Sequence, residues 1–359
     1  MLPLLGAFDY LREIVIATSA VHIATLRRCH GNSSSTELVD ALVAKQRAFR
    51  LLREALANID PSSRPVILIA VVFFINFDLI DSGRGGWKTH IKAAGRLICS
   101  LQEVDKAAAS AIAPLSDMVV ADCITYHILG STLTAPEDSH QSIFDSIDMM
   151  SVLQRAETFS YQCCPPPVLQ VLLSASRLRP DRSPIGKEVA ASMISEVRSV
   201  DIQTWVHSIR NLSPEDDLDT RMRMASAHQA ATCLYILLAL SATTEAQSYS
   251  PSTEALVCEI LEHLTLVPID HALTKGTVWP TFMAAAQTQD RGKRQWCLQR
   301  LQALWQSTPW VCPWGYVETA MDMLHSIWDS HDLREVGSDE RPNWLLRLRG
   351  LREENCLIV

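Results

Sequence analysis

Glycine is scarce in this sequence, with 13 in 359 residues, about half of its usual share in a globular protein. Tight hairpin turns need glycine where φ is positive, so the shortage disfavours a sheet of many short strands and favours long helices. Hydrophobic residues make up 48% and charged residues 20% of the chain, a balance that excludes an intrinsically disordered protein. We therefore expect a helical globular protein that needs no disulfide or metal in order to fold.

Positive charge is not in excess, and no apolar run is long enough to cross a membrane. The chain has 32 Lys and Arg against 40 Asp and Glu, a net charge of −8, which argues against binding nucleic acid through bulk charge. The most apolar run covers residues 66–75, whereas a membrane-spanning helix needs about 20 residues. Because the N-terminus also lacks the basic start of a signal peptide, we expect an intracellular protein of the nucleus or cytoplasm.

The motifs of common catalytic and metal sites are missing. The ten cysteines include no C-x-x-C pair, and the eleven histidines form no H-E-x-x-H motif. There is no G-x-S-x-G element, and residues 83–86 (Gly-Arg-Gly-Gly) lack the order of a phosphate-binding loop. We therefore expect no metal and no cofactor, assign no catalytic residue, and interpret residues 83–86 as a helix end. The adjacent Cys163 and Cys164 are expected to be free thiols, because a disulfide between neighbours is strained.

An acidic cluster, Asp216-Asp217-Leu218-Asp219, has two interpretations. Paired aspartates on helices bind magnesium and diphosphate in terpene synthases, but here the third carboxylate comes one residue too early and no second acidic motif follows. Ser213 and Pro214 instead predict the start of a helix, with Ser213 as its cap and the carboxylates at its positive end.

Apolar residues recur with helical spacing along the whole chain, and no series alternates as strands do. Breaks at proline and glycine predict helices over residues 8–28, 87–104 and 114–133, with further Leu/Ala-rich helices up to the C-terminus. Residues 66–79 are apolar on nearly all sides, which is typical of a central helix, although a buried strand over the first eight residues is the rival interpretation. The sequence predicts an all-α fold, with residues 1–359 as one extended multi-helix domain whose two possible lobes meet near residues 160–185.

One helix carries an apolar stripe whose members are spaced by three and four residues. It is predicted to begin at a capping box of Ser34 and Glu37 and to run to about residue 59. The stripe predicts its buried face and consists of Leu38, Leu42, Phe49, Leu52, Leu56 and Ile59.

Tryptophan is concentrated near the C-terminus, where residues 279–344 hold seven of the nine. Large aromatic side chains fill cores in most proteins, and that is the first interpretation. The second is an aromatic-lined pocket for apolar or conjugated molecules.

Residues 87–94, with the sequence Trp-Lys-Thr-His-Ile-Lys-Ala-Ala, resemble the W-x-x-H-[LI]-[RK]-G-A element of the fungal-specific transcription factor domain, second type. Other segments resemble this family in the same order along nearly the whole chain. They are residues 48–56, 166–179, 227–240, 278–284, 296–305 and 317–328. The family is the all-helical region that follows the zinc cluster of many fungal regulators. The zinc cluster itself, with its six cysteines and basic stretch, has no counterpart here, so we expect no direct binding to nucleic acid.

The resemblance implies a regulatory or effector domain, which we expect to be tied to secondary metabolism and to bind an apolar small molecule or a protein partner. The alternative is the same helical scaffold used as a cofactor-independent enzyme that shapes an apolar intermediate for cyclisation, of the pericyclase or Diels–Alderase type. A non-catalytic scaffold subunit is a third interpretation, and oligomerisation is left open. The candidate pocket-lining or hydrogen-bonding residues are Trp87, His90, Tyr126, His127, Trp279 and Trp314. For His90, a structural role between helices is the competing interpretation.

Overall fold

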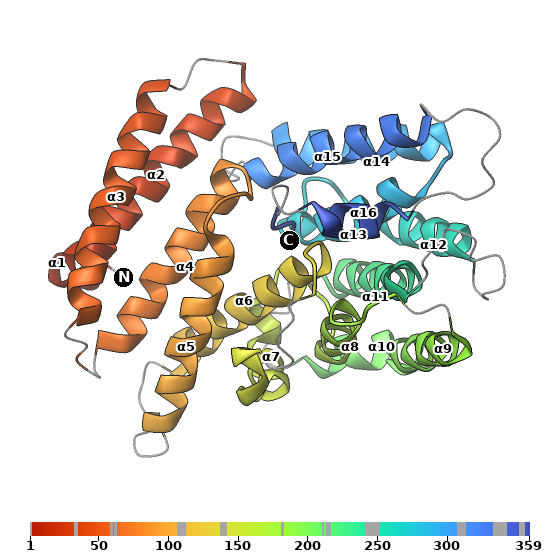
Figure 1. Ribbon diagram of the computed structural model, residues 1–359, viewed down its shortest axis with the longest axis horizontal. Helices are drawn as coiled ribbons and strands as arrows, with labels where there is room; N and C mark the ends of the chain where they lie inside the picture. The colour runs from red at the N-terminus through yellow and green to blue at the C-terminus, as the bar shows by residue number, and fades with distance from the viewer. Residues whose placement is uncertain are drawn as a thin grey trace.

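The computed structural model describes most of the chain as a set of packed helices (Figure 1). The described residues are 2–31, 35–57, 60, 63–105, 113–136, 142–180, 183–209, 212, 217–240, 252–306, 314–332, 343–351 and 356–359. Within them there is no β-strand, so the all-α prediction is confirmed. None of the described helices has both the length and the hydropathy that crossing a bilayer requires.

The helices follow one another with short connections. In the first half they are α1 (Leu2–Ala7), α2 (Asp9–Cys29), α3 (Ser35–Ala57), α4 (Arg64–Asp81), α5 (Trp87–Asp105), α6 (Ala113–Thr132), the 3₁₀ helix η2 (Ile143–Ser146), α7 (Met149–Ala156), η3 (Glu157–Phe159) and α8 (Pro166–Ser176). In the second half they are α9 (Pro184–Ser199), α10 (Ile202–Ser208), α11 (Leu218–Leu240), α12 (Thr253–Thr265), η4 (Thr274–Thr277), α13 (Val278–Gln287), α14 (Arg291–Gln306), α15 (Gly315–Asp332) and α16 (Trp344–Gly350).

Two helices are buried on nearly all sides, and the others pack around them. The first is α4, which contacts α2, α5, α6 and α15, so the prediction of a central helix over residues 66–79 is confirmed. The second is α11, which contacts α8, α9, α10, α12 and α13. In Figure 1 the α2–α3 hairpin lies on the outer side of α4, away from α11.

The helix expected after residue 34 exists, but the prediction of its buried face was wrong. The residues of α3 that are buried against α2 are Ala41, Ala44, Ala48 and Leu52. Leu42, Phe49 and Leu56 from the predicted stripe are 51%, 38% and 41% exposed. Alanine lets two helix backbones approach closely, so the small residues rather than the large ones form the interface with α2. Ser34 and Ile59 lie outside the described residues.

The start of α11 also differs from its prediction. The helix begins at Leu218, and Asp217 caps it by accepting from the Thr220 backbone N–H at 3.0 Å and from the Thr220 hydroxyl. These hydrogen bonds lower the pKa of Asp217, because they stabilise its ionised form. Ser213, the cap predicted from the sequence, lies outside the described residues.

The end of α4 is held by the last residues of the chain. Gly83 has a φ of +70° and donates its N–H to the carbonyl of Asp78 at 2.7 Å, as predicted for a helix end. Leu357 donates to the Gly83 carbonyl at 2.8 Å, and Tyr316 donates its hydroxyl to the Val359 carbonyl at 2.7 Å. One hydrophobic cluster therefore runs from Tyr10 to Val359. The division into two lobes stays a prediction.

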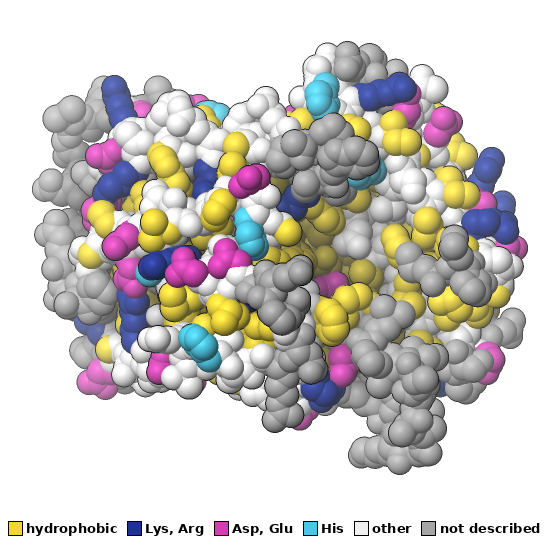
Figure 2. All heavy atoms as spheres, turned by 180° about the vertical axis from the view of Figure 1, so that it is seen from behind, with side chains coloured by type: hydrophobic (Ala, Val, Ile, Leu, Met, Phe, Trp, Pro, Cys, Tyr) yellow, Lys and Arg dark blue, Asp and Glu magenta, His cyan; other side chains and the backbone are white. Residues whose placement is uncertain are grey.

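Figure 2 shows the face opposite to that of Figure 1. Acidic and basic side chains are interspersed over it, and no large area carries positive charge alone. The face has hydrophobic side chains scattered between the charges.

Candidate ligand-binding site

A cavity of about 280 Å³ lies between α5, α6, η2 and the end of α8. It is larger than two further cavities, of about 100 Å³ beside Trp314 and about 20 Å³ beside Asp122. The residues that line it are Trp87, Lys88, Ile91, Lys92, Arg96, His127, Ser131, Thr134, Ala135, Pro136, Ser142, Ile143, Phe144, Ser176 and Arg177. Its size and mixed lining are those of a small-molecule site.

Helix α5 gives the cavity one apolar wall with a cationic edge. Trp87 and Ile91 are each 3% exposed and belong to the core. Lys88, Lys92 and Arg96 follow one another at intervals of four residues, so they lie along one side of the helix next to that apolar wall. The amphipathic pattern of α5 therefore places apolar and cationic groups side by side in one cavity.

The Trp87 ring lies against α6 at a position where only glycine fits. A Cβ atom at Gly130 would lie 2.5 Å from the indole ring, which is closer than carbon atoms can approach. Gly130 thus lets the indole lie close to the α6 backbone. The wall formed by α5 and the wall formed by α6 meet at this contact.

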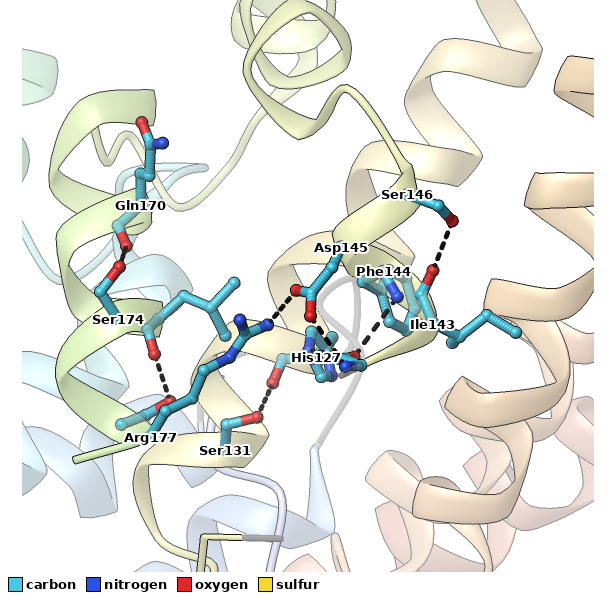
Figure 3. Close-up of polar contacts among 12 residues, drawn as sticks. His127, Ser131, Ile143, Phe144, Asp145, Ser146, Gln170, Ser174 and Arg177 are labelled. Carbon is cyan, nitrogen blue, oxygen red and sulfur yellow. Dashed lines mark hydrogen bonds and ion pairs between the residues drawn. The ribbon is translucent and has the colours of Figure 1, made fainter. Parts of the chain in front are cut away.

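A second aromatic pair forms the opposite side. The rings of His127 and Phe144 are stacked, with centroids 4.3 Å apart and planes 13° apart. The Nε2 atom of His127 lies 3.4 Å from the Ser142 hydroxyl. His127 comes from α6 and Phe144 from η2, so this stack holds the 3₁₀ helix against α6 (Figure 3).

An ion pair connects η2 to the end of α8. Asp145 accepts from the Ser142 backbone N–H at 2.8 Å, which completes a capping box at the start of η2. Its other oxygen accepts from Arg177 at 2.6 Å. Figure 3 shows Arg177 extending from the end of α8 towards Asp145. This bridge fixes the distance between two walls of the cavity.

The structure brings two of the six sequence-predicted candidates, Trp87 and His127, into this cavity. It places His90, Tyr126, Trp279 and Trp314 in other surroundings.

His90 packs between helices beside a buried ion pair. Lys45 contacts Asp78 at 2.6 Å, and His90 Nε2 lies 3.8 Å from the other oxygen of Asp78. Its ring stacks on Phe74 and Phe49. Burial, and to a lesser degree the charge of Lys45, lower the pKa of His90 to about 4. This environment matches the structural role between helices that the sequence analysis gave as the competing interpretation.

Tyr126 is buried on the face of α6 that points away from the cavity. Its hydroxyl donates to the Asn76 side chain at 3.2 Å. Burial raises its pKa, and the nearby Tyr161 and Asp122 act in the same direction. Burial also raises the pKa of Asp122 to about 7. These groups lie at the cavity of about 20 Å³, which has room for a single water molecule.

The tryptophans of residues 279–344 serve the core rather than the large cavity. Trp279 is fully buried and donates from Nε1 to the Thr132 hydroxyl at 3.2 Å. Trp305, Trp328 and Trp344 are also buried, and Trp310 lies outside the described residues. Trp314 lines the cavity of about 100 Å³, with the Lys275 ammonium 5.4 Å from its ring centroid. The core-filling interpretation therefore describes this cluster.

Across the described part of the chain, no three His, Cys, Asp or Glu side chains are grouped so that they could hold a metal ion. Cys163 and Cys164 are both free thiols, as predicted, and burial raises the pKa of Cys164. Cys164 precedes the start of α8 by two residues.

Sequence reasoning missed most of the cavity. The spacing of Lys88, Lys92 and Arg96 beside Trp87 is a signal that could have pointed to the α5 wall. Phe144 and Arg177 lie far from α5 in sequence and carry no such pattern, because only the folded arrangement of η2 and α8 places them there.

The comparisons with known proteins agree on one family. The family model described as "Fungal specific transcription factor domain" matches residues 1–348. A curated protein of Neurospora crassa, "Acriflavine sensitivity control protein acr-2", is 46% identical over 371 aligned positions. The alignment covers 100% of this chain and 62% of that protein, so the chain spans less than two thirds of its relative's length. No solved structure matches the chain.

Proposed function

The chain belongs to the family of the fungal specific transcription factor domain, and from this premise we propose that it regulates transcription as a domain that senses a small molecule. The ligand binds in the cavity between α5, α6, η2 and α8. Binding shifts the domain between forms that differ in their effect on transcription, because a ligand stabilises the form that it binds better.

The cavity is the observation that carries this proposal. It joins four elements that are far apart in sequence, so a molecule bound there contacts all of them at once. The stack of His127 on Phe144 and the bridge of Arg177 to Asp145 hold η2 in place in the absence of a ligand. A cavity of about 280 Å³ fits a small molecule better than a helix of a protein partner, which has a diameter of about 10 Å.

The proposal assigns no direct DNA contact to residues 1–359. A net charge of −8 and the interspersed charges in Figure 2 support this, because proteins bind DNA through clustered Lys and Arg. The expected result is no salt-dependent change in the anisotropy of labelled duplex DNA when the purified chain is added. Tight binding to one sequence would contradict this part of the proposal.

The name of the Neurospora crassa relative concerns sensitivity to acriflavine. By analogy, we propose that the genes under control respond to an aromatic compound that the cell meets or makes. A link to secondary metabolism stays a prediction, as does the alternative of a cyclising enzyme. The enzyme would need the same cavity, and incubation of the purified chain with polyene intermediates tests for a change in rate or stereochemistry.

The test of the sensing function fills the cavity. Ala135 lines it and is exposed, so Ala135→Trp blocks the space with little effect on the core. Ala57→Trp, at the exposed end of α3, is the matched control. We expect the gene response to an aromatic compound to be lost with Ala135→Trp and kept with Ala57→Trp, at equal protein levels. A normal response in both variants would overturn the sensing function.

A further inference from the structure

The charge of the cavity is opposite to that of the chain. Four of its described lining residues are Lys or Arg, and none of them is Asp or Glu. The whole chain, in contrast, has eight more acidic than basic residues. A local excess of positive charge in an acidic protein concentrates anions at that place.

The four cations are not equivalent. Arg177 is paired with Asp145 at 2.6 Å, so its charge is largely balanced at the rim. Lys88, Lys92 and Arg96 all belong to α5 and form one row along the cavity. The Lys88 ammonium lies 5.6 Å from the centroid of the Trp87 ring. The excess charge therefore lies on the α5 side, next to the aromatic wall.

The apolar part of the lining suits flat rings. Trp87 and Ile91 form a buried surface on α5, and Phe144 with its stacked partner His127 faces it from η2 and α6. Aromatic rings prefer such stacked or edge-on neighbours. A ligand that uses both features has a planar aromatic body and one negatively charged end.

We propose that the cavity binds a planar aromatic carboxylate, with its rings between Trp87 and Phe144 and its carboxylate at Lys92 and Arg96. This inference rests on the proposed sensing function and names the chemical class of its ligand. Arg96 can bind the carboxylate with two parallel hydrogen bonds, which gives orientation as well as affinity. A cationic aromatic dye would meet like charges along α5, so the cavity selects against it.

Three probes of equal shape and different charge test the proposal. They are 2-naphthoate, its neutral amide, and the cationic 2-naphthylmethylammonium, each titrated calorimetrically into the full chain at neutral pH. We expect naphthoate to bind at least about ten-fold more tightly than the amide, and the cation to bind more weakly than both. The preference for naphthoate should decrease as salt is added.

Variants then locate the charge effect. Lys92→Gln combined with Arg96→Gln should reduce the preference for naphthoate over the amide to about two-fold or less. Arg47→Gln combined with Arg50→Gln removes the same charge from an exposed part of α3 and should leave the preference unchanged. Because all four residues are exposed, both double variants are expected to fold.

The outcomes separate this inference from the sensing function. If naphthoate and the amide bind equally well and Ala135→Trp abolishes both, the cavity is a ligand site and the carboxylate preference is overturned. If the α3 control loses as much preference as the α5 variant, the charge effect is not local and the inference is also overturned. If no probe binds at millimolar concentration, the inference fails, whereas the gene response of Ala135→Trp decides the sensing function separately.

Discussion

The indole of Trp87 occupies space that a side chain on Gly130 would need. A Cβ atom there would lie 2.5 Å from one ring atom and 2.6 Å from another. This contact joins the first residue of α5 to α6 and forms the corner of the cavity. The shape of the proposed ligand site thus depends on the absence of one methyl group.

Gly130→Ala should displace the Trp87 ring. We expect a loss of about 1–3 kcal/mol in the free energy of unfolding, because added atoms in a packed core force neighbours out of position. Naphthoate binding should weaken at the same time. The control is Gly6→Ala on α1, where the new methyl group would meet nothing within 4 Å and should leave stability unchanged or slightly raised. Urea denaturation measures both, and equal stabilities would contradict the assigned contact.

Arg349 anchors the last helix through three acceptors. Its guanidinium donates to the Thr132 carbonyl at 3.1 Å, to the Ser176 carbonyl at 3.0 Å and to the Tyr235 hydroxyl. The compact ammonium of lysine lacks the planar fork that reaches all three. Arg349→Lys should therefore cost about 2–3 kcal/mol, through buried acceptors that lose their donor.

The control for Arg349 lies on the same helix. Arg347 is exposed, so Arg347→Lys should change stability by less than about 0.5 kcal/mol. Ser176 also lines the cavity, so Arg349→Lys should weaken naphthoate binding whereas Arg347→Lys should not. Thermal unfolding and calorimetric titration of the two variants provide the comparison.

The sequence was sufficient for the helices and insufficient for some of their contacts. Period, proline and glycine located α4 and α5 to within two residues at each end, because local signals determine where a helix starts and stops. The face of α3 was predicted wrongly from its large apolar residues. Which face a helix buries depends on the partner, and here the partner α2 takes the row of Ala41, Ala44 and Ala48.

The candidate site shows the same limit. Residue type alone selected Trp87 and His127, which do line the cavity, and also His90 and Trp279, which fill the core. An aromatic or imidazole ring has the same sequence signature in either place. Only the packing of η2 and the end of α8 against α6 decides which rings border an open space.

The alanine face of α3 leads to a direct test. Ala48 is fully buried, so Ala48→Leu overfills the close contact with α2 and should cost about 1–3 kcal/mol. Leu42→Ala removes a half-exposed side chain and should cost less than about 1 kcal/mol. The opposite order of stabilities in urea denaturation would restore the face predicted from the large residues.

Stability should fall in mild acid because His228 is buried in its neutral form. Burial lowers its pKa to about 4, although its hydrogen bond at 2.9 Å to the Gly276 carbonyl acts in the opposite direction. In the unfolded chain the pKa is about 6.5. Between these two values the unfolded chain binds a proton that the folded protein does not, so the contribution is complete above about pH 6.5 and is lost as the pH falls towards 4. The loss amounts to about 3 kcal/mol.

His228→Gln isolates this contribution. The glutamine amide can still donate towards Gly276 but does not titrate, so the variant should lose about 3 kcal/mol less than the wild type between about pH 7 and pH 4. His90, whose pKa is also lowered to about 4, is present in both proteins and cancels in the comparison. His207→Gln, at an exposed position of α10, should follow the wild type. If urea denaturation gives parallel pH curves for the wild type and His228→Gln, then His228 is not the buried neutral group, and its stacking on Trp279 with planes 3° apart would need another explanation.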